Sequence, residues 1–489
     1  MIILAAELNQ LPLLAADVGN AYLEALTHEK IYFIAGPEFA PFSLEGHTLV
    51  LFKALYGLRS SGQEWHRALS KTLRAEGFTP SLADPDVWMR KNIQHQLWEY
   101  ICVYVDDLAL AMLNGTEFLD KLKTPIEQGG YGYKIKGDGP LTHHLGCDYF
   151  RDKDGTLGYH TKLYIEKMMD TYIRIFKSPP KPASSALVSG DHPELDDSPL
   201  LDGPGITTYM SLIGQLGWLI NCGNIHVIQA VVALSSFRAA PRQGHLERVK
   251  RVYGFVGKFK EAAIRVRTGI PNYDHIDAQY PTQDWSESVY GTDPEEEPPN
   301  MPEPLGKRMR ITIYVDANLY FDLITGRACT GILIFLNQTL IDWFCKKQNS
   351  VATATFGSEF VAAKTGVEKS QDIRYTLQML GIPVEYCTYM FGDNQSVVTQ
   401  GTIPHSQLTK RHHALAYHYV RESVANGSIK FVHIAGIHNP ADCLTKFLGY
   451  QIWYPLLRTL LFWIGDTNNI PQSTQTPKKS GIKNPDDEA

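Results

Sequence analysis

Two adjacent carboxylates, Asp106 and Asp107, lie between two apolar runs of the sequence. Apolar runs on both sides of a short turn predict a β-hairpin with both acids at its tip. A third acid, Asp17, ends another apolar run upstream. Because buried charge must be paired or bound to metal, three carboxylates from two strand ends predict a site that holds two Mg²⁺ ions for nucleotidyl transfer. A solvated turn is the alternative interpretation of an Asp-Asp pair.

A second series of acids follows in the last third of the chain. Asp316 and Asp393 each end a predicted strand, and Glu359 lies early in a long predicted helix. Asp442 lies in what the sequence predicts as the first turn of a last helix. An α/β sheet gathers residues at strand ends and helix starts, so this ordered set predicts four carboxylates around two metal ions. Each acid alone would be interpreted as a cap or turn residue.

The elements that must position these acids fall into segments. Residues 1 to about 180 mix strand-like and helix-like runs, and residues 206–265 carry apolar positions at helical spacing. Residues 308–448 are predicted as strand, hairpin, helix, strand and helix. Residues 182–202 and 268–306 are rich in acids and Pro and contain no Lys or Arg, which predicts loops or linkers. The polar tail from about residue 466 is expected to be disordered.

Composition and charge set wider bounds. The 489 residues are 44% hydrophobic and 20% charged, typical of a globular protein with two or three domains. The 7 cysteines form no C-x-x-C pair, which argues against a zinc site or a disulfide framework and favours a reducing compartment. We expect neither a signal peptide nor a membrane span. The net charge is −6, but without the two acidic linkers the remainder carries about +8, compatible with binding a phosphate backbone.

The motifs occur in the order found in one family. The chain resembles the reverse transcriptase and ribonuclease H region of copia-type LTR retrotransposon polyproteins over about residues 1–450. The first half carries Asp-Val-Gly-Asn-Ala-Tyr at 17–22, Leu-Tyr-Gly-Leu at 55–58, Tyr-Val-Asp-Asp at 104–107, Leu-Gly-Cys-Asp-Tyr-Phe at 145–150 and Tyr-Met-Ser-Leu-Ile-Gly-Gln-Leu at 209–216. The second half carries Tyr-Val-Asp-Ala at 314–317, Thr-Gly-Arg-Ala-Cys-Thr-Gly at 325–331, Ser-Glu-Phe at 358–360, Gly-Asp-Asn-Gln-Ser at 392–396 and Ala-Asp-Cys-Leu-Thr-Lys at 441–446.

The resemblance implies a fold and a domain order. We expect an α+β palm-type polymerase domain with a helical thumb, followed by an α/β ribonuclease H-like domain with a mixed five-stranded sheet. The expected segments are a palm at 1–180, a thumb-like helical region with an acidic loop at 181–267, an acidic Pro-rich linker at 268–307, a ribonuclease H-like domain at 308–450, and a C-terminal extension with a disordered tail at 451–489.

The resemblance also implies roles for single residues. Asp17, Asp106 and Asp107 would bind two metal ions that activate a primer 3′-hydroxyl and stabilise the leaving pyrophosphate. The four later acids would hold the metals that activate water against the RNA strand of a hybrid. Tyr22 would exclude a 2′-hydroxyl, although a core aromatic is the alternative, and His438 would assist proton transfer or product release unless it is a plain loop residue. The remaining expected nucleotide contacts are Gly57, Arg59 and Tyr104.

Cofactors and partners follow from the same resemblance. We expect two Mg²⁺ per site, with Mn²⁺ as a substitute, and as partners an RNA template, a DNA primer, an RNA/DNA hybrid, dNTPs and other polyprotein products such as integrase and capsid. The expected location is a cytoplasmic virus-like particle or the nucleus, without membrane attachment.

One departure from the family pattern affects the expected activity. Only 16 residues precede Asp17, none of them Lys or Arg, whereas the family places a basic fingers subdomain there. We therefore expect a chain truncated within the palm, with weak or absent polymerase activity and a complete second site. Three interpretations stay open: a two-site enzyme, a hybrid nuclease with an inactive polymerase, and a non-catalytic nucleic-acid-binding remnant.

Overall fold

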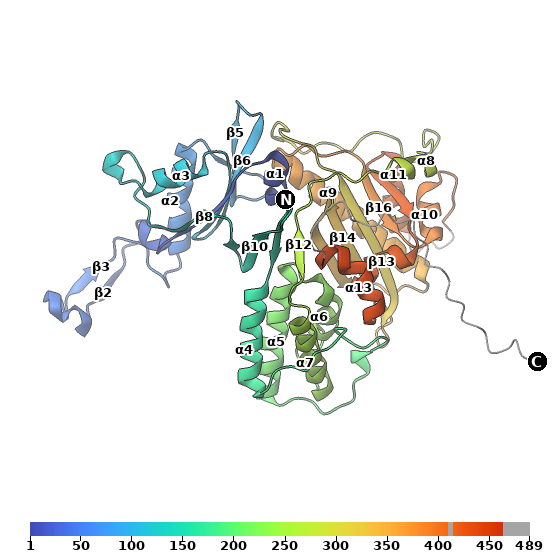
Figure 1. Ribbon diagram of the computed structural model, residues 1–489, viewed down its shortest axis with the longest axis horizontal. Coiled ribbons are helices and arrows are strands. Elements are labelled where there is room, and N and C mark those ends of the chain that lie inside the picture. Colours follow the sequence, from blue (N-terminus) through green and yellow to red (C-terminus); the bar gives the residue numbers. More distant parts are fainter. Residues whose placement is uncertain (409–413, 463–489) are drawn as a thin grey trace, which may run out of the picture.

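The computed structural model describes residues 1–408 and 414–462. Its first body is an antiparallel six-stranded sheet of mixed strand lengths, at the left of Figure 1. Apolar faces of two amphipathic helices, α2 (Ser61–Ala75) and α3 (Gly115–Lys123), pack on this sheet and bury Trp65, Leu69 and Phe118. The strands in spatial order are β4 (Thr79–Pro80), β5 (Val87–Asn92), β6 (Leu97–Tyr104), β7 (Asp107–Ala111), β1 (Leu13–Val18) and β8 (Ile135–Pro140).

The predicted hairpin is confirmed within this sheet. β6 and β7 pair in antiparallel register, with Tyr104 opposite Asp107, so that Val105 and Asp106 form the turn. β1 lies on the other side of β7, with Asp17 opposite Asp107. A separate two-stranded arm, β2 (Tyr32–Ile34) and β3 (Thr48–Val50), extends away from the body (Figure 1).

A four-stranded sheet and a group of helices follow. The sheet consists of β9 (His143–His144), β10 (Cys147–Arg151), β11 (Leu157–His160) and β12 (Ala263–Arg265). Below it in Figure 1 lie the helices expected from the apolar spacing, together with the helix that precedes the acidic loop. They are α4 (Lys162–Phe176), α5 (Gly203–Asn221), α6 (Ile228–Ser235) and α7 (Gln243–Lys258).

The last body is a mixed five-stranded sheet in the order β15-β14-β13-β16-β17. The first three strands form the predicted antiparallel meander, and β16 and β17 add in parallel to β13. The strands are β13 (Ile311–Asp322), β14 (Arg327–Leu336), β15 (Thr339–Lys347), β16 (Thr388–Gly392) and β17 (Ile429–His433). The helices are α9 (Thr355–Met379), α10 (Gln395–Thr402), α11 (Ala414–Ala425), α12 (Asp442–Thr445) and α13 (Tyr450–Leu461).

Two expectations about element ends need correction. The strand expected to end at Asp316 runs on to Asp322, so Asp316 lies in its middle, opposite Gly331 of β14. The helix expected to start near Asp442 is a single turn of 4 residues. A second helix, α13, follows it and packs Trp453 and Leu457 against the helices of the middle region.

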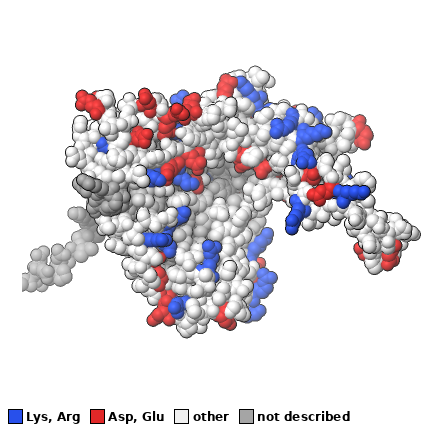
Figure 2. Space-filling model, turned by 180° about the vertical axis from the view of Figure 1, so that it is seen from behind, with Lys and Arg blue, Asp and Glu red and all other residues white. Residues whose placement is uncertain are grey.

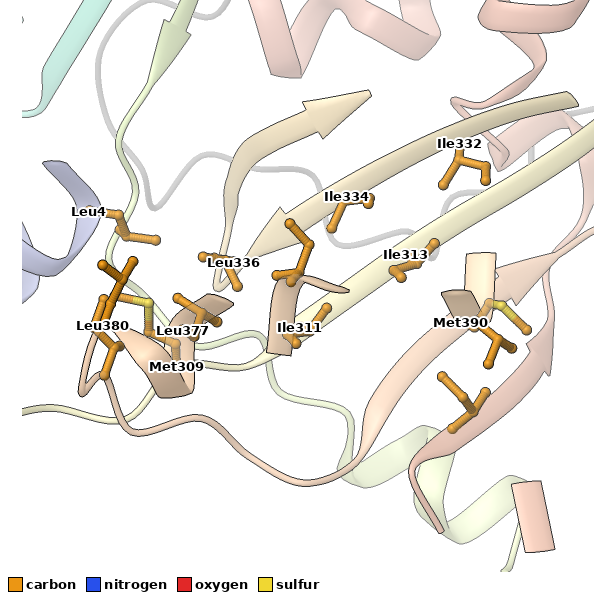
Figure 3. Packing of buried hydrophobic residues seen from close by; sticks show 14 of the residues in the cluster. Leu4, Met309, Ile311, Ile313, Ile332, Ile334, Leu336, Leu377, Leu380 and Met390 are labelled. Atoms are coloured by element: carbon orange, nitrogen blue, oxygen red, sulfur yellow. The ribbon is translucent and has the colours of Figure 1, made fainter. Parts of the chain in front are cut away.

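The largest hydrophobic core among the described residues joins the N-terminal helix to the five-stranded sheet. Alternate residues of β13 and β14, including Ile313 and Ile334, face α9 and share a hydrophobic core with its residue Leu377. The first helix, α1 (Ile2–Asn9), adds Leu4 to the same core, next to Leu377 and Leu380 (Figure 3). The N-terminal helix is therefore part of the packing of the five-stranded sheet.

The acidic linker is partly packed rather than free. It contains one short helix, α8 (Asp274–Gln279), that the composition did not predict, and it buries Ile276 and Trp285. Ile276 packs against Tyr389, Phe391 and Val432 of the outer parallel strands. Within the described ranges, no helix combines the length and the apolar character needed to cross a bilayer. The predicted disorder from residue 466 lies outside the described residues.

Candidate active sites

The first candidate site is the tip of the β6–β7 hairpin and the adjoining part of β1. The turn residue Val105 has φ 58, a left-handed conformation that is strained for a β-branched side chain. Two hydrogen bonds hold this turn in place: the indole N–H of Trp65 donates to the carbonyl oxygen of Val105 at 2.6 Å, and the N–H of Val18 donates to the carbonyl oxygen of Asp106 at 2.8 Å. The fold thereby places the predicted acids Asp17, Asp106 and Asp107 side by side.

These three acids repel one another electrostatically. Partial burial and the charges of Asp106 and Asp107 raise the pKa of the Asp17 carboxyl, while Lys136 acts in the opposite direction. Lys136 stands opposite Asp17 on β8. Nδ1 of the buried His144 lies 3.6 Å from Oδ2 of Asp107. The sequence interpretation missed both of these basic neighbours, because they come from strands that only the fold brings next to the hairpin.

The other residues expected at the first site lie around the hairpin. The rings of Tyr22 and Tyr56 have centroids 4.5 Å apart, and Tyr22 is half-buried, so its ring is supported rather than buried in the core. Gly57 has φ 99, which favours glycine, and lies with Arg59 in the exposed loop before α2. Tyr104 is 58% exposed.

The second candidate site lies where β13, β16, α9 and α12 meet. Oxygens of Asp316, Glu359 and Asp393 approach within 4.8 Å of one another, and in the described part of the chain no other group of three His, Cys, Asp or Glu side chains is this tight. Asp316 is fully buried and Glu359 is 6% exposed. Carboxylate oxygens in this arrangement are the ligands that Mg²⁺ and Mn²⁺ prefer, so the donor set fits a divalent cation.

Asp442 joins this group through a lysine. The ammonium of Lys446 donates to Oδ1 of Asp442 at 2.8 Å and to Oδ1 of Asp316 at 3.2 Å. The hydroxyl of Thr445 donates to the other oxygen of Asp316. Lys446 had no assigned role in the sequence interpretation, although its spacing of four residues from Asp442 is that of a helical ion pair.

The acids of this second group share an excess of negative charge. Burial and the neighbouring carboxylates raise the pKa of Glu359 well above its ordinary value and that of Asp393 above its ordinary value. Burial and Asp316 raise the pKa of Asp442 to about 7, while Lys446 opposes this shift. A cluster of this kind is short of positive charge, and a bound cation would restore the ionised carboxylates.

The approach of α12 to the sheet depends on a glycine. A Cβ at Gly331 would lie 2.6 Å from Cγ2 of Thr445 and 3.0 Å from the carbonyl oxygen of Ala441. The buried side chain of Asn439 donates to the carbonyl oxygen of Val315 at 2.9 Å and accepts from the N–H of Ala441. Together these contacts fix the position of Asp442 relative to β13.

His438 lies near this second site but outside the acid cluster. Its side chain is exposed and lines a cavity of about 330 Å³ with Tyr314 and Arg267, on the face of β13 that carries Asp316. Seen from behind, the surface is hollowed between the first body and the five-stranded sheet, and Lys and Arg side chains lie on both sides of the hollow (Figure 2).

Comparison with known proteins shows which family part of this chain matches and which proteins it is similar to. Residues 1–173 match the family described as "Reverse transcriptase (RNA-dependent DNA polymerase)". The Retrovirus-related Pol polyprotein from transposon RE1 of Arabidopsis thaliana is 24% identical over 440 residues, which cover 89% of this chain and 26% of that protein. The corresponding polyprotein from transposon TNT 1-94 of Nicotiana tabacum is 26% identical and covers 88% of this chain. The chain thus spans between a quarter and a third of the length of these relatives, 26% and 29%.

Solved structures with some likeness fall into two groups. RNase H1 from Halobacterium salinarum is 16% identical and covers 28% of this chain and 94% of its own length, with a TM-score of 0.23. The foamy viral protease-reverse transcriptase in complex with RNA/DNA hybrid is 11% identical and covers 92% of this chain and 69% of its own length, with a TM-score of 0.26. The expected fold class is confirmed by the strand order, the pairing and the helices described above.

Proposed function

Since this chain is a relative of the retrotransposon Pol polyproteins, with a reverse transcriptase and ribonuclease H-like region, we propose that it cleaves the RNA strand of RNA/DNA hybrids at its second acidic site. The observation that carries the proposal is the buried group of Asp316, Glu359 and Asp393, whose oxygens lie within 4.8 Å of one another. Buried carboxylates gathered this closely need a cation to offset their repulsion.

The chemistry assigns each acid a task. Asp316, Glu359, Asp393 and Asp442 would hold two Mg²⁺ or Mn²⁺ ions, which when bound lower the pKa of an attacking water and stabilise the leaving oxygen. Asp316 is rigid because it is buried in mid-strand and accepts a hydrogen bond from Thr445, so it would be the fixed ligand of the group. Asp442 is 16% exposed and would hold an ion nearer to solvent than the fully buried Asp316 does.

We further propose that Asp17, Asp106 and Asp107 catalyse primer extension on an RNA template, with dNTPs as substrates. The hydrogen bond from Trp65 and the strained turn at Val105 support this role, because strain concentrates at functional sites. Tyr22, supported by Tyr56, would contact the sugar of the incoming nucleotide. The remaining nucleotide contacts in this proposal are Gly57, Arg59 and Tyr104.

The proposed partners are nucleic acids bound in the hollow of Figure 2, whose bordering Lys and Arg side chains suit a phosphate backbone. Other polyprotein products, such as integrase and capsid, would act with this chain in a virus-like particle in the cytoplasm or in the nucleus. We retain the segments 1–180, 181–267, 268–307, 308–450 and 451–489 as the proposed domain division.

A hybrid nuclease without polymerase activity is the second candidate. Within the described residues the later acids form a tight group, whereas Asp17, Asp106 and Asp107 do not meet the same distance limit. That difference favours a metal-binding nuclease site over the hairpin site in the isolated chain.

Two substitutions test the proposal and separate the candidates. The wild-type chain, Asp106→Asn and Asp393→Asn are assayed for primer extension on RNA and for cleavage of a labelled RNA/DNA hybrid in Mg²⁺. Hybrid cleavage lost only in Asp393→Asn supports the nuclease, and extension lost only in Asp106→Asn supports the polymerase. A folded wild-type protein with neither activity would refute both and leave a non-catalytic remnant.

A further inference from the structure

The site proposed for hybrid cleavage contains a cation that belongs to the chain itself. We propose that Lys446 is an internal counter-ion that competes with a divalent metal for Asp316 and Asp442, and that its ammonium must leave these carboxylates when the metal binds. The inference rests on the proposed function only in locating the metal at this acid cluster.

The first argument comes from the bonding of Asp316. Both oxygens of this fully buried carboxylate already accept a bond: Oδ1 from Lys446 at 3.2 Å, and Oδ2 from the hydroxyl of Thr445. A metal that is bound by Asp316 together with Glu359 and Asp393 must therefore approach an oxygen that already has a donor. Thr445 is itself fully buried and held by the backbone of α12, so it cannot withdraw easily.

Lys446, in contrast, is able to withdraw. Its side chain is 33% exposed, and it follows the last residue of α12, with extended backbone at φ −123 and ψ 140. A lysine has a long flexible stem and a strongly hydrated ammonium, so it can rotate to solvent without disturbing the core. The same ammonium also bonds Asp442 at 2.8 Å, so one side-chain rotation would free an oxygen on two of the four acids.

The charges support an exchange rather than coexistence. Two divalent ions would neutralise four carboxylates completely. The ammonium of Lys446, left between the carboxylates of Asp316 and Asp442, would then face two dications at short range. Like charges at such distances repel strongly where water is scarce. Without metal the opposite holds, because the acids then need a cation to offset their own repulsion.

The test measures metal affinity directly, in full-length protein that carries Asp106→Asn and Asp107→Asn to silence the hairpin acids. Free Mn²⁺ is followed by electron paramagnetic resonance at pH 8. In this background Lys446→Met is expected to bind Mn²⁺ about ten-fold more tightly or better, the gain that follows from removing a competing charged hydrogen bond. Lys446→Arg keeps the charge and is expected to bind within about two-fold of the parent. Asp316→Asn should lose the binding, which locates it at this site.

A matched control separates competition from general damage. Lys347, whose side chain is 25% exposed, forms a similar ion pair at 2.9 Å with Asp322. Asp322 is the last residue of β13, beyond Asp316. Lys347→Met is expected to lower the melting temperature in EDTA, as Lys446→Met should, but to leave Mn²⁺ affinity unchanged.

The outcomes are distinct. Unchanged or weaker Mn²⁺ binding in a folded Lys446→Met protein would overturn the inference and leave Lys446 as a structural ion pair. Tighter binding supports it, whether or not the protein cleaves hybrids. Hybrid cleavage is measured on the same samples, and its absence in metal-loaded wild-type protein would refute the proposed function alone.

Discussion

The hydroxyl of Tyr100 donates a hydrogen bond of 2.8 Å to the carbonyl oxygen of Leu380, so a strand of the first sheet caps the end of α9. Both residues are buried, at 3% and 4% exposure. The last carbonyl groups of a helix have no partner within the helix. The first body supplies partners here, since the hydroxyl of Ser81 also donates to the carbonyl oxygen of Met379 at 3.1 Å.

Replacing Tyr100 by Phe should therefore weaken the contact between the two bodies. The variant leaves the buried carbonyl of Leu380 without its donor, and we expect a loss of about 1–2 kcal/mol in the free energy of unfolding. Urea denaturation followed by tryptophan fluorescence measures the change. Tyr104→Phe, on the same strand but 58% exposed, is the control and should be neutral for stability. Equal stability of both variants would contradict the capping role of Tyr100.

Trp65 should control the activity of the hairpin site through Val105. Trp65→Phe removes the 2.6 Å bond that holds the strained turn, so Asp106 would shift from its position. We expect primer extension to fall about ten-fold or more, because small displacements of catalytic groups are costly. Trp98→Phe is the control. Trp98 lies at the other end of β6, and its indole N–H donates a hydrogen bond of 2.9 Å to the carbonyl oxygen of Glu303, which the variant removes. A similar loss in both variants would indicate general destabilisation instead.

A methyl group at Gly331 should separate α12 from β13 and so move Asp442 away from the other acids of the second site. Gly331→Ala places a Cβ 2.6 Å from Thr445 and would push α12, with Asp442, away from β13. We expect hybrid cleavage to be lost and stability to fall by about 1–3 kcal/mol, the usual cost of overpacking. Gly139→Ala, with nothing within 4 Å of its Cβ, should keep both properties. Full cleavage by Gly331→Ala would show that α12 tolerates the displacement.

His226 should make the stability of the protein depend on pH. Burial lowers the pKa of its imidazole to about 3, and neither ring nitrogen has a hydrogen-bond partner among the described protein groups. In the unfolded chain the imidazole has a pKa near 6.5, so below that pH it binds a proton that it does not bind in the folded state. The free energy of unfolding therefore falls as the pH drops below about 6.5, and above that pH His226 does not affect it.

The comparison with His226→Leu isolates this effect. Between pH 7 and pH 5 the wild-type protein should lose about 2 kcal/mol more stability than the variant. Urea denaturation at both pH values measures the difference. Equal pH dependence of the two proteins would mean that the imidazole of His226 binds a proton in the folded state as readily as in the unfolded chain.

Local patterns in the sequence predicted the hairpin and the helices, because alternation and helical spacing are properties of short segments. The hairpin whose turn contains Val105 and the long helix that carries Glu359 are examples. The end of β13 was not predictable in the same way. Its continuation past Asp316 depends on pairing with β14 and on a register shift between Asn318 and Asp322.

Contacts between distant segments account for the rest. Lys446 lies in a motif that the sequence singled out, but its bond to Asp316 joins positions 130 residues apart. Composition predicted a loop or linker where Ile276 and Trp285 are buried. The segments that cover them, β16 and β17 for Ile276 and α11 with Arg421 for Trp285, lie later in the chain. Most candidate acids could thus be named from the sequence, whereas their positively charged neighbours required the fold.

The placement of Leu4 in the core of the five-stranded sheet has a consequence for biosynthesis. Leu4 and Leu377 share one core, yet more than three hundred residues separate them, so Leu377 leaves the ribosome roughly 20–75 s after Leu4 at typical rates. During that time α1 can pack on the first sheet, whose residues Leu97 and Tyr100 belong to the same core, but its contacts with α9 and the five-stranded sheet are still missing, a state prone to aggregation. A chain built in this way gains from chaperones that cover α1 until α9 has been made.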